Sequence, residues 1–173
     1  MNQIVALVEE YASPAITQEV GLRGEELVLE AFARHQFVQH SRHARSYGER
    51  IWAHSDHTLD FIFERDGVAY GVEVKNTLPY MEREDFDRTI EICKELDLRC
   101  VHVVRRNPEP WLLELRDLGG FTLMLDFQLY PPLLGDLVQR ISTGLKLPVD
   151  CPRTLWDGTM KRFLDWHERT RGV

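Results

Sequence analysis

The chain has little of what identifies several large classes of protein. Its three cysteines are scattered over 173 residues and odd in number, which disfavours a disulfide framework and favours a reducing compartment such as the cytoplasm. No apolar run approaches the ~20 residues that span a bilayer, so no membrane partner is expected. The first residues include Glu9 and Glu10 and lack the basic start of a secretory signal.

Nucleotide-binding motifs and an excess of positive charge are also absent. Neither GxGxxG nor GxxxxGK[ST] occurs, so dinucleotide-binding and P-loop chemistry are not indicated. The net charge of −7 argues against a protein that coats nucleic acid by bulk charge. Residues 34–57 reverse this sign and hold five of the seven histidines. An anionic partner is therefore expected to approach through 34–57 or the C-terminal part.

What is present predicts one α/β domain over residues 1–173, because 43% of the residues are hydrophobic and can form a sizeable core. Residues 41–56 are polar and rich in Arg, Ser and Gly, so they are expected to form a loop. The predicted order of elements favours a central mixed β-sheet flanked by helices. Helices are predicted near 4–11, 17–35, 84–97, 133–142 and 157–169, and strands near 59–63, 68–76, 100–104 and 121–127, with a hairpin turn at Asp66-Gly67.

One carboxylate is out of place on the predicted helix 17–35. Glu25 projects into an apolar stripe, where a carboxylate is costly unless a metal or a cation compensates it. Gly24 beside it lowers helix propensity by about 1 kcal/mol relative to Ala, which is reasonable if another backbone or a ligand approaches closely. Alternatively, Glu25 lies at the rim of the stripe and reaches solvent. The stripe consists of Leu22, Val28, Leu29 and Phe32.

Two further carboxylates lie in predicted strands. Asp60 interrupts the strand at 59–63, although Asp is disfavoured in strands. Glu73 and Lys75 share one face of the strand at 68–76, because alternate residues of a strand point the same way. Each has a simpler alternative: Asp60 on the wet face of an edge strand, and a Glu73–Lys75 pattern that half-buried strands show routinely.

The combination points to metal chemistry. In an antiparallel hairpin Asp60 and Glu73 can become neighbours, and two adjacent carboxylates repel each other unless a cation intervenes. Oxygen ligands of this kind suit Mg²⁺, and Mn²⁺ is expected to substitute. With Lys75 nearby to hold a water, the set predicts hydrolysis of a phosphodiester bond by a metal-activated water.

These residues resemble the PD-(D/E)xK, or restriction-endonuclease-like, nuclease superfamily. Asp60, twelve residues and then Glu73-Val74-Lys75 match its signature, and Gly24-Glu25 matches the upstream Glu of many members. The resemblance covers about 18–106, leaves 107–173 as additions, and is nearest in pattern to archaeal-type Holliday junction resolvase-like nucleases. Leu59 replaces the nominal proline, and no QxxxY element follows Lys75.

The resemblance implies a restriction-endonuclease-like core and a role for each matched residue. Asp60 and Glu73 would bind Mg²⁺ with the backbone carbonyl of Val74. Glu25 would be an accessory ligand, and Lys75 would orient the attacking water.

The segment 34–57 supplies the expected nucleic-acid contacts. Arg42, Arg45, Tyr47 and Arg50 are predicted to line a cleft and contact the phosphates or a base, although a solvated loop is an equal alternative. A zinc site from His40-x-x-His43 and His54-x-x-His57 is less favoured, because no cysteine is near and the segment does not read as a helix.

The function expected from all these residues is a Mg²⁺-dependent endonuclease that acts on DNA, with RNA not excluded. The alternative is a non-catalytic member of the same fold that serves as a nucleic-acid-binding or assembly subunit. In that case the C-terminal helices would be the expected surface for a homodimer.

Overall fold

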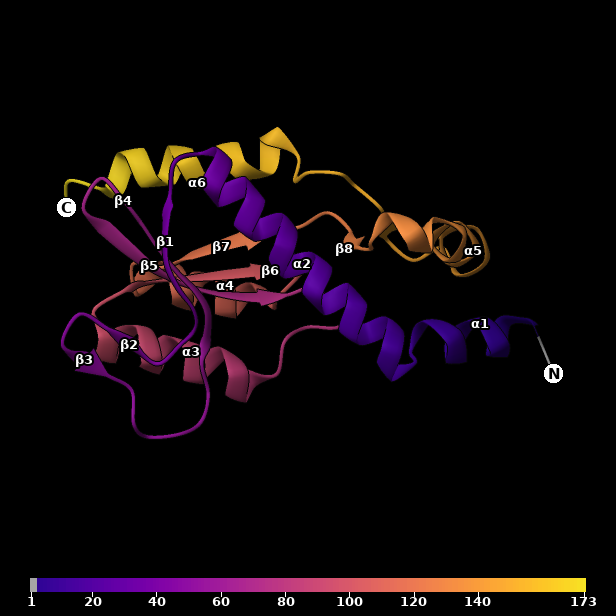
Figure 1. The fold of residues 1–173 in the computed structure, drawn as a ribbon, viewed down its shortest axis with the longest axis horizontal. Coiled ribbons are helices and arrows are strands. Elements are labelled where there is room, and N and C mark those ends of the chain that lie inside the picture. Colours follow the sequence, from indigo (N-terminus) through magenta and orange to yellow (C-terminus); the bar gives the residue numbers. More distant parts are fainter. Residues whose placement is uncertain (1–2) are drawn as a thin grey trace.

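The chain folds into three layers, with a central β-sheet between two layers of helices (Figure 1). The structure is a computed structural model and describes residues 3–173. Within that range, no helix combines the length and the apolar character needed to cross a membrane. The helices are α1 (Gln3–Tyr11), α2 (Pro14–Arg34), α3 (Arg83–Leu96), α4 (Glu109–Asp117), α5 (Gly135–Leu145) and α6 (Asp157–Thr170), with a 3-10 turn η1 (Pro132–Leu134). The strands are β1 (Val38–Ala44), β2 (Ser46–Tyr47), β3 (Arg50–Ile51), β4 (Leu59–Arg65), β5 (Val68–Lys75), β6 (Arg99–Val104), β7 (Phe121–Met124), β8 (Gln128–Leu129) and β9 (Val149–Asp150).

The central sheet is mixed, as predicted, and has the order β1-β4-β5-β6-β7. The β1–β4 and β4–β5 pairs are antiparallel, whereas β5, β6 and β7 are parallel. The predicted turn at Asp66-Gly67 joins β4 to β5, and both residues have the positive φ that a tight hairpin turn requires, 54° and 75°. The α/β class with a mixed sheet flanked by helices is therefore confirmed.

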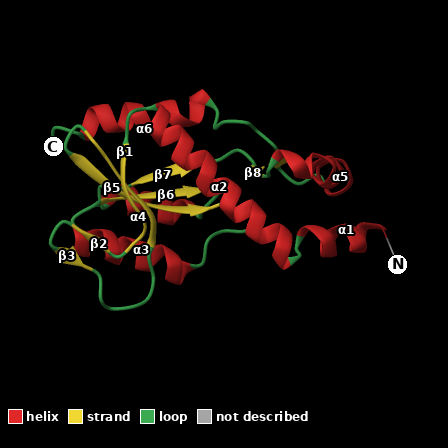
Figure 2. Ribbon diagram, viewed as in Figure 1, coloured by secondary structure: helices red, strands yellow, loops and turns green. Residues whose placement is uncertain are grey.

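Helices cover both faces of the sheet (Figure 2). On one face α2 and α6 pack on Phe61, Phe63 and Val72 in the main core. On the other face α3 and α4 pack on Leu59 and Ile62. Each crossover, β5-α3-β6 and β6-α4-β7, returns the chain to the same edge of the sheet, as parallel strands require. The amino-terminal end of α3 therefore lies near the carboxyl end of β5.

The prediction of one loop over 41–56 is wrong. Residues 38–44 form β1, an edge strand that pairs with β4 from Val38–Glu64 to Ala44–Leu59, and β2 and β3 form a small hairpin beyond it. Six of the seven β1 residues are exposed or half-buried. An edge strand held by backbone hydrogen bonds needs no apolar alternation, so its polar sequence resembled a loop.

The predicted apolar stripe of α2 is displaced. Leu22 is 50% exposed, and Leu29 only borders the core. The face of α2 that packs on the core includes the small residues Gly24 and Ala31, which allow a close approach. The buried stripe is therefore centred on these residues and not on Leu22 and Leu29. The buried residues of α2 are Val20, Gly24, Leu27, Val28, Ala31 and Phe32.

Three elements after residue 106 escaped prediction. These are α4 and the parallel strands β8 and β9, and the strand predicted at 121–127 ends at Met124. Strands of two residues have no period to detect, since alternation needs about four residues or more.

Asn76, the residue that follows β5, connects β5 to α2 and β8. Its buried amide nitrogen donates to the carbonyls of Val20 in α2 and Leu129 in β8, at 2.7 and 2.6 Å. Its amide oxygen accepts from the backbone N–H of Leu129 at 2.8 Å. A Cβ placed on Gly24 would lie 2.6 Å from the Asn76 Cβ. A close approach therefore does occur at Gly24, but the side chain of Asn76 makes it, and not the backbone or ligand that was expected.

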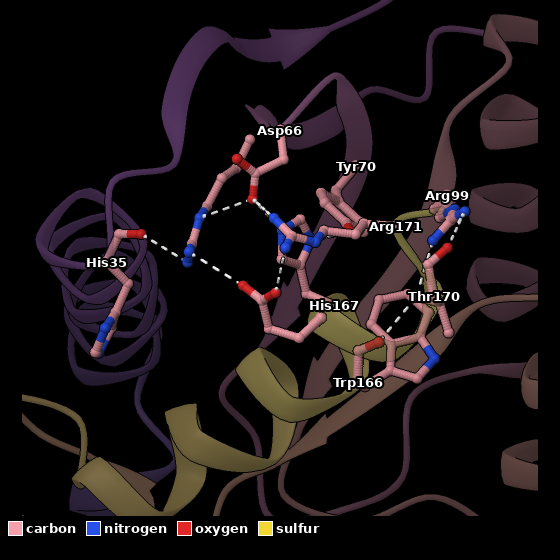
Figure 3. A network of polar contacts seen from close by, with 10 residues as sticks. His35, Asp66, Tyr70, Arg99, Trp166, His167, Thr170 and Arg171 are labelled. Atoms are coloured by element: carbon pink, nitrogen blue, oxygen red, sulfur yellow. Dashed lines mark hydrogen bonds and ion pairs between the residues drawn. The ribbon is translucent and has the colours of Figure 1, made fainter. Parts of the chain in front are cut away.

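The carboxyl-terminal helix is held against the β4–β5 turn by a chain of hydrogen bonds from the exposed Asp66 to the buried His167 and Tyr70 (Figure 3). His167 is fully buried; its Nε2 lies 3.0 Å from Asp66, and its Nδ1 lies 2.6 Å from the Tyr70 hydroxyl. A carboxylate only accepts hydrogen bonds, so in the neutral ring Nε2 carries the proton and Nδ1 accepts from Tyr70. Burial raises the pKa of Tyr70 to about 12, so its hydroxyl remains a donor.

Substitution of two glycines of α2 by alanine should have opposite effects. Gly21→Ala should raise the free energy of unfolding by about 0.5–1 kcal/mol, because its Cβ would meet nothing within 4 Å and helix propensity improves. Gly24→Ala should lower it by about 1–3 kcal/mol, because Asn76 has to move. Urea denaturation measures both, and an increase in both variants would contradict the role given to Asn76.

Candidate active site

The register of the central hairpin brings Asp60 and Glu73 to facing positions. The ladder runs from Arg65–Val68 to Phe61–Val72, and Asp60 and Glu73 occupy the next position in the same register. Here the pairing stops, and the backbone N–H of Val74 donates to Asp60 Oδ2 at 2.7 Å. One carboxylate therefore lies at the start of β4 and the other in β5, at the point where the two strands separate.

Glu73 is buried with only half of its carboxylate satisfied. The residue is 4% exposed, and its Oε1 lies 3.1 Å from Lys75 Nζ. Its Oε2 is buried and has no hydrogen-bond partner among the described residues. A buried carboxylate oxygen without a partner is unfavourable, so the position suits a bound cation.

Lys75 is held between two carboxylates. Its Nζ lies 3.1 Å from Glu73 Oε1 and 3.3 Å from Asp85 Oδ2. Burial lowers the pKa of Lys75, but Glu73 and Asp85 outweigh that effect, and the net pKa is raised. Lys75 is therefore a fixed positive charge beside Glu73.

The two facing carboxylates resist ionisation. Burial raises the pKa of Glu73 from 4.5 to about 8, and the adjacent Asp60 adds to the shift. Burial also raises the pKa of Asp60 from 3.8 to about 6 despite the Val74 hydrogen bond, and Glu25 adds to it. A divalent cation would favour the ionised form of both groups, because opposite charge lowers a carboxyl pKa.

Glu25 approaches this pair from α2. Its side chain is 17% exposed and lies beside the apolar stripe rather than in its middle. Arg42 of β1 donates to Glu25 Oε2 at 3.1 Å. Glu25 is close enough to raise the pKa of Asp60. Glu25, Asp60, Glu73, Lys75 and Arg42 therefore form one site, which we call the carboxylate site.

Sequence reasoning missed Asp85 and considered His57 only for the less favoured zinc site. Asp85 lies in the first turn of α3, which follows β5 and returns to its carboxyl end. Burial lowers the pKa of His57, and the charges of Asp85 and Lys75 also act on it. An acidic residue in the first turn of the helix after the Lys75 strand was the available signal for Asp85.

Three of the four residues predicted to contact nucleic acid lie outside the carboxylate site. Arg45 Nη1 lies 3.4 Å from Asp56 Oδ1. The Tyr47 hydroxyl donates to Glu64 at 2.8 Å, near the β4–β5 turn. Arg50 lies 3.8 Å from Asp97, beyond the last turn of α3. Tyr47 and Arg50 are therefore at the opposite end of the sheet from Lys75.

The four histidines considered for zinc do not converge in the structure. His40 lies 3.0 Å from Glu64, His43 faces Asp60 across the β1–β4 pair, and His54 packs edge-on against Trp52. The fourth, His57, lies near Asp85.

Another cluster, not the carboxylate site, brings three ligand atoms together. Within residues 3–173, only Asp66, His167 and Glu168 hold three such atoms within 4.8 Å of one another. Arg65 and Arg171 each contact both Asp66 and Glu168. These guanidinium groups already compensate the carboxylates, so the cluster serves to hold α6 against the hairpin turn.

The residues of the carboxylate site fit a divalent cation on chemical grounds. The Glu73 Oε2 atom is buried and unpartnered, and on the facing strand burial raises the pKa of Asp60. Mg²⁺ keeps several waters and needs only one or two protein carboxylates. Comparison of the chain with protein-family models, curated proteins and solved structures gives no match.

The carboxylates of Asp60 and Glu73 predict a pH-dependent stability. Both have raised pKa values, so without divalent metal the folded state binds more protons than the unfolded state above pH ~4. The melting temperature should therefore fall as the pH rises through about 6 and 8, and Mg²⁺ should restore it at high pH. Thermal unfolding with EDTA and with Mg²⁺ measures both effects.

In EDTA, Glu73→Gln should remove most of the fall in melting temperature at the upper end of this pH range, near pH 8. Glu19→Gln, an exposed residue of α2, is the matched control and should keep the wild-type profile. A wild-type melting temperature that rises steadily from pH 5 to pH 8 in EDTA would contradict the prediction.

Proposed function

We propose that the chain is a Mg²⁺-dependent endonuclease that hydrolyses phosphodiester bonds in DNA. The observation that carries this proposal is the facing pair of carboxylates, the half-buried Asp60 and the buried Glu73, with Lys75 Nζ at 3.1 Å from Glu73. Networks of ion pairs that serve only stability rarely leave a buried oxygen such as Glu73 Oε2 without a partner. A metal site, in contrast, requires an oxygen that is free to bind the ion.

Four residues would hold the metal. Asp60 and Glu73 supply carboxylate oxygens, the Val74 carbonyl is the third proposed ligand, and Glu25 acts directly or through water. Bound Mg²⁺, or Mn²⁺ in its place, lowers the pKa of a water and stabilises negative charge on the phosphate. Arg42 would fix the Glu25 side chain, because its Nη2 lies 3.1 Å from Glu25 Oε2.

Lys75 would orient the attacking water and offset the charge that develops on the phosphate. Its ammonium has three donors, and Glu73 and Asp85 engage two of them. The third is free to hold a water beside Glu73. Asp85 is thus a positioning residue, because it keeps Lys75 protonated and fixes its direction.

The substrate proposal is a DNA strand in a narrow cleft, with RNA as a related substrate. The net charge of −7 disfavours a broad electrostatic footprint. The nearest pattern, that of archaeal-type Holliday junction resolvase-like nucleases, makes branched DNA one substrate to test. All three cysteines are free thiols, which fits a reducing compartment such as the cytoplasm.

A second candidate function rests on the partners that the site carboxylates already have. Glu73 contacts Lys75, Glu25 contacts Arg42, and Asp60 accepts from the Val74 N–H. A site neutralised in this way would suit a non-catalytic nucleic-acid-binding or assembly subunit, with a homodimer through its C-terminal helices.

Lys75→Ala should lower the rate of DNA cleavage by at least about 100-fold, as loss of a charge-stabilising donor does in other enzymes. The assay uses supercoiled, linear, single-stranded and branched DNA with Mg²⁺ or Mn²⁺. Asp60→Asn and Glu73→Gln should also abolish calorimetric Mg²⁺ binding.

Lys94→Ala is the matched control, because Lys94 is an exposed lysine in the last turn of α3, away from Lys75. It should cleave as the wild type does. No cleavage of any substrate by the wild type, together with no Mg²⁺ binding, would favour the assembly subunit. Equal cleavage by Lys75→Ala and wild type would refute the catalytic role of Lys75.

A further inference from the structure

A basic cleft lies next to the carboxylate site, at the carboxyl ends of the parallel strands. It has a volume of about 720 Å³ and is lined by Arg105 and Arg106, which follow β6, and by Arg162 of α6. In open α/β sheets, ligands bind in crevices at this edge. A volume of several hundred Å³ is typical of small-molecule and cofactor sites.

The arginines of the cleft differ from most arginines of this chain. Eleven of the seventeen form ion pairs with carboxylates within residues 3–173, which leaves six that do not. Three of those six line this one cleft. The six are Arg99, Arg105, Arg106, Arg153, Arg162 and Arg169.

Their donor groups are only partly used. Arg105 Nη2 donates to the Leu78 carbonyl at 2.7 Å, but its Nε is buried without a partner. Arg162 Nη2 donates to the Met124 carbonyl at 3.2 Å. A guanidinium has five N–H donors, so most remain available to an anion. Burying a charged donor without a partner is unfavourable, and an anion in the cleft would relieve it.

The remaining lining fits a phosphate that carries an organic group. Asp126 is the acidic residue of the lining, so the cleft keeps a net positive charge. Pro79, Leu147 and Pro148 provide apolar surface beside the arginines. Guanidinium groups bind phosphate oxygens in a bidentate manner, and the apolar wall suits a sugar or a base.

Neighbouring strands carry residues of the cleft and of the proposed active site to the same edge of the sheet. Lys75 pairs with Val104 in the β5–β6 ladder, and Arg105 is the next residue. Leu78, which accepts from Arg105, lies three residues after Lys75. A strand whose scissile phosphate lies at Lys75 would bring a flanking phosphate toward Arg105 and Arg106.

We propose that this cleft binds a phosphate group of the nucleic-acid strand that flanks the cleavage site. The proposal rests on the proposed nuclease function, because that function supplies the strand. The same chemistry would accept an internal phosphodiester or a terminal phosphate. Binding can be measured without cleavage, so the two proposals can fail separately.

The test measures binding of short single-stranded DNA in EDTA, where no cleavage occurs. Two strands with a 3′ fluorescein label are used, one with a 5′-phosphate and one with a 5′-hydroxyl, and fluorescence anisotropy gives the dissociation constants. Arg106→Gln and Arg162→Gln should each weaken binding about tenfold. They should also lower the slope of log Kd against log salt by about 0.7, as for one lost phosphate contact.

The matched control is Arg169→Gln, which removes an unpaired arginine about two turns further along α6, outside the cleft. It should bind as the wild type does. A preference for the 5′-phosphate strand, with competition by inorganic phosphate, would assign a terminal phosphate. Equal binding of both strands would assign an internal phosphodiester.

The proposal is overturned if Arg106→Gln and Arg162→Gln bind both strands as tightly as Arg169→Gln. It is also overturned if the wild type binds neither strand. Cleft variants that lose binding in a protein that cuts no DNA would uphold the cleft and reject the nuclease. Cleft variants that bind normally, beside an inactive Lys75→Ala, would reject the cleft and uphold the nuclease.

Discussion

Five backbone-paired positions between β4 and β5 set the arrangement on which the rest of the molecule depends. The Asp66-Gly67 turn fixes their register, and a slip of one residue would move every side chain to the opposite face. That register buries Phe61 and Phe63 under α2 and α6, and brings Asp60 level with Glu73. The His167 contact to Asp66 holds α6 on the same turn, so the core and the carboxylate site share one support.

Electrostatic compensation explains how an acidic chain can present basic sites. Most arginines are engaged with neighbouring carboxylates, so the charge of −7 describes the whole surface rather than any one part. In the carboxylate site burial disfavours negative charge, because Glu73 is buried and the half-buried Asp60 lies beside it. The basic cleft carries positive charge, and the buried Nε of Arg105 in it has no hydrogen-bond partner. The two lie side by side at one sheet edge, an arrangement suited to a phosphate-bearing chain and a divalent cation together.

The parts of the site that the sequence predicted are those that local rules control. The hairpin turn and the two-residue alternation were sufficient to place Glu73 and Lys75 on one face, with Asp60 on the neighbouring strand. The helix that carries Glu25 also followed from periodicity, and the close approach at Gly24 was anticipated, although its partner Asn76 was not. Asp85 was missed because its contact with Lys75 depends on the crossover that returns α3 to the end of β5.

The sequence by itself determined the α/β class, the central hairpin and the identity of the carboxylates, because these follow from short-range patterns and turn chemistry. Only the tertiary structure decided which arginines remain free, since ion pairs such as Arg50 with Asp97 join residues that no local period relates. It also decided that residues 38–44 form an edge strand, because their hydrogen bonds come from β4 and not from their own pattern. The burial that raises the pKa of Glu73 has the same origin, for a pKa responds to everything packed around the group.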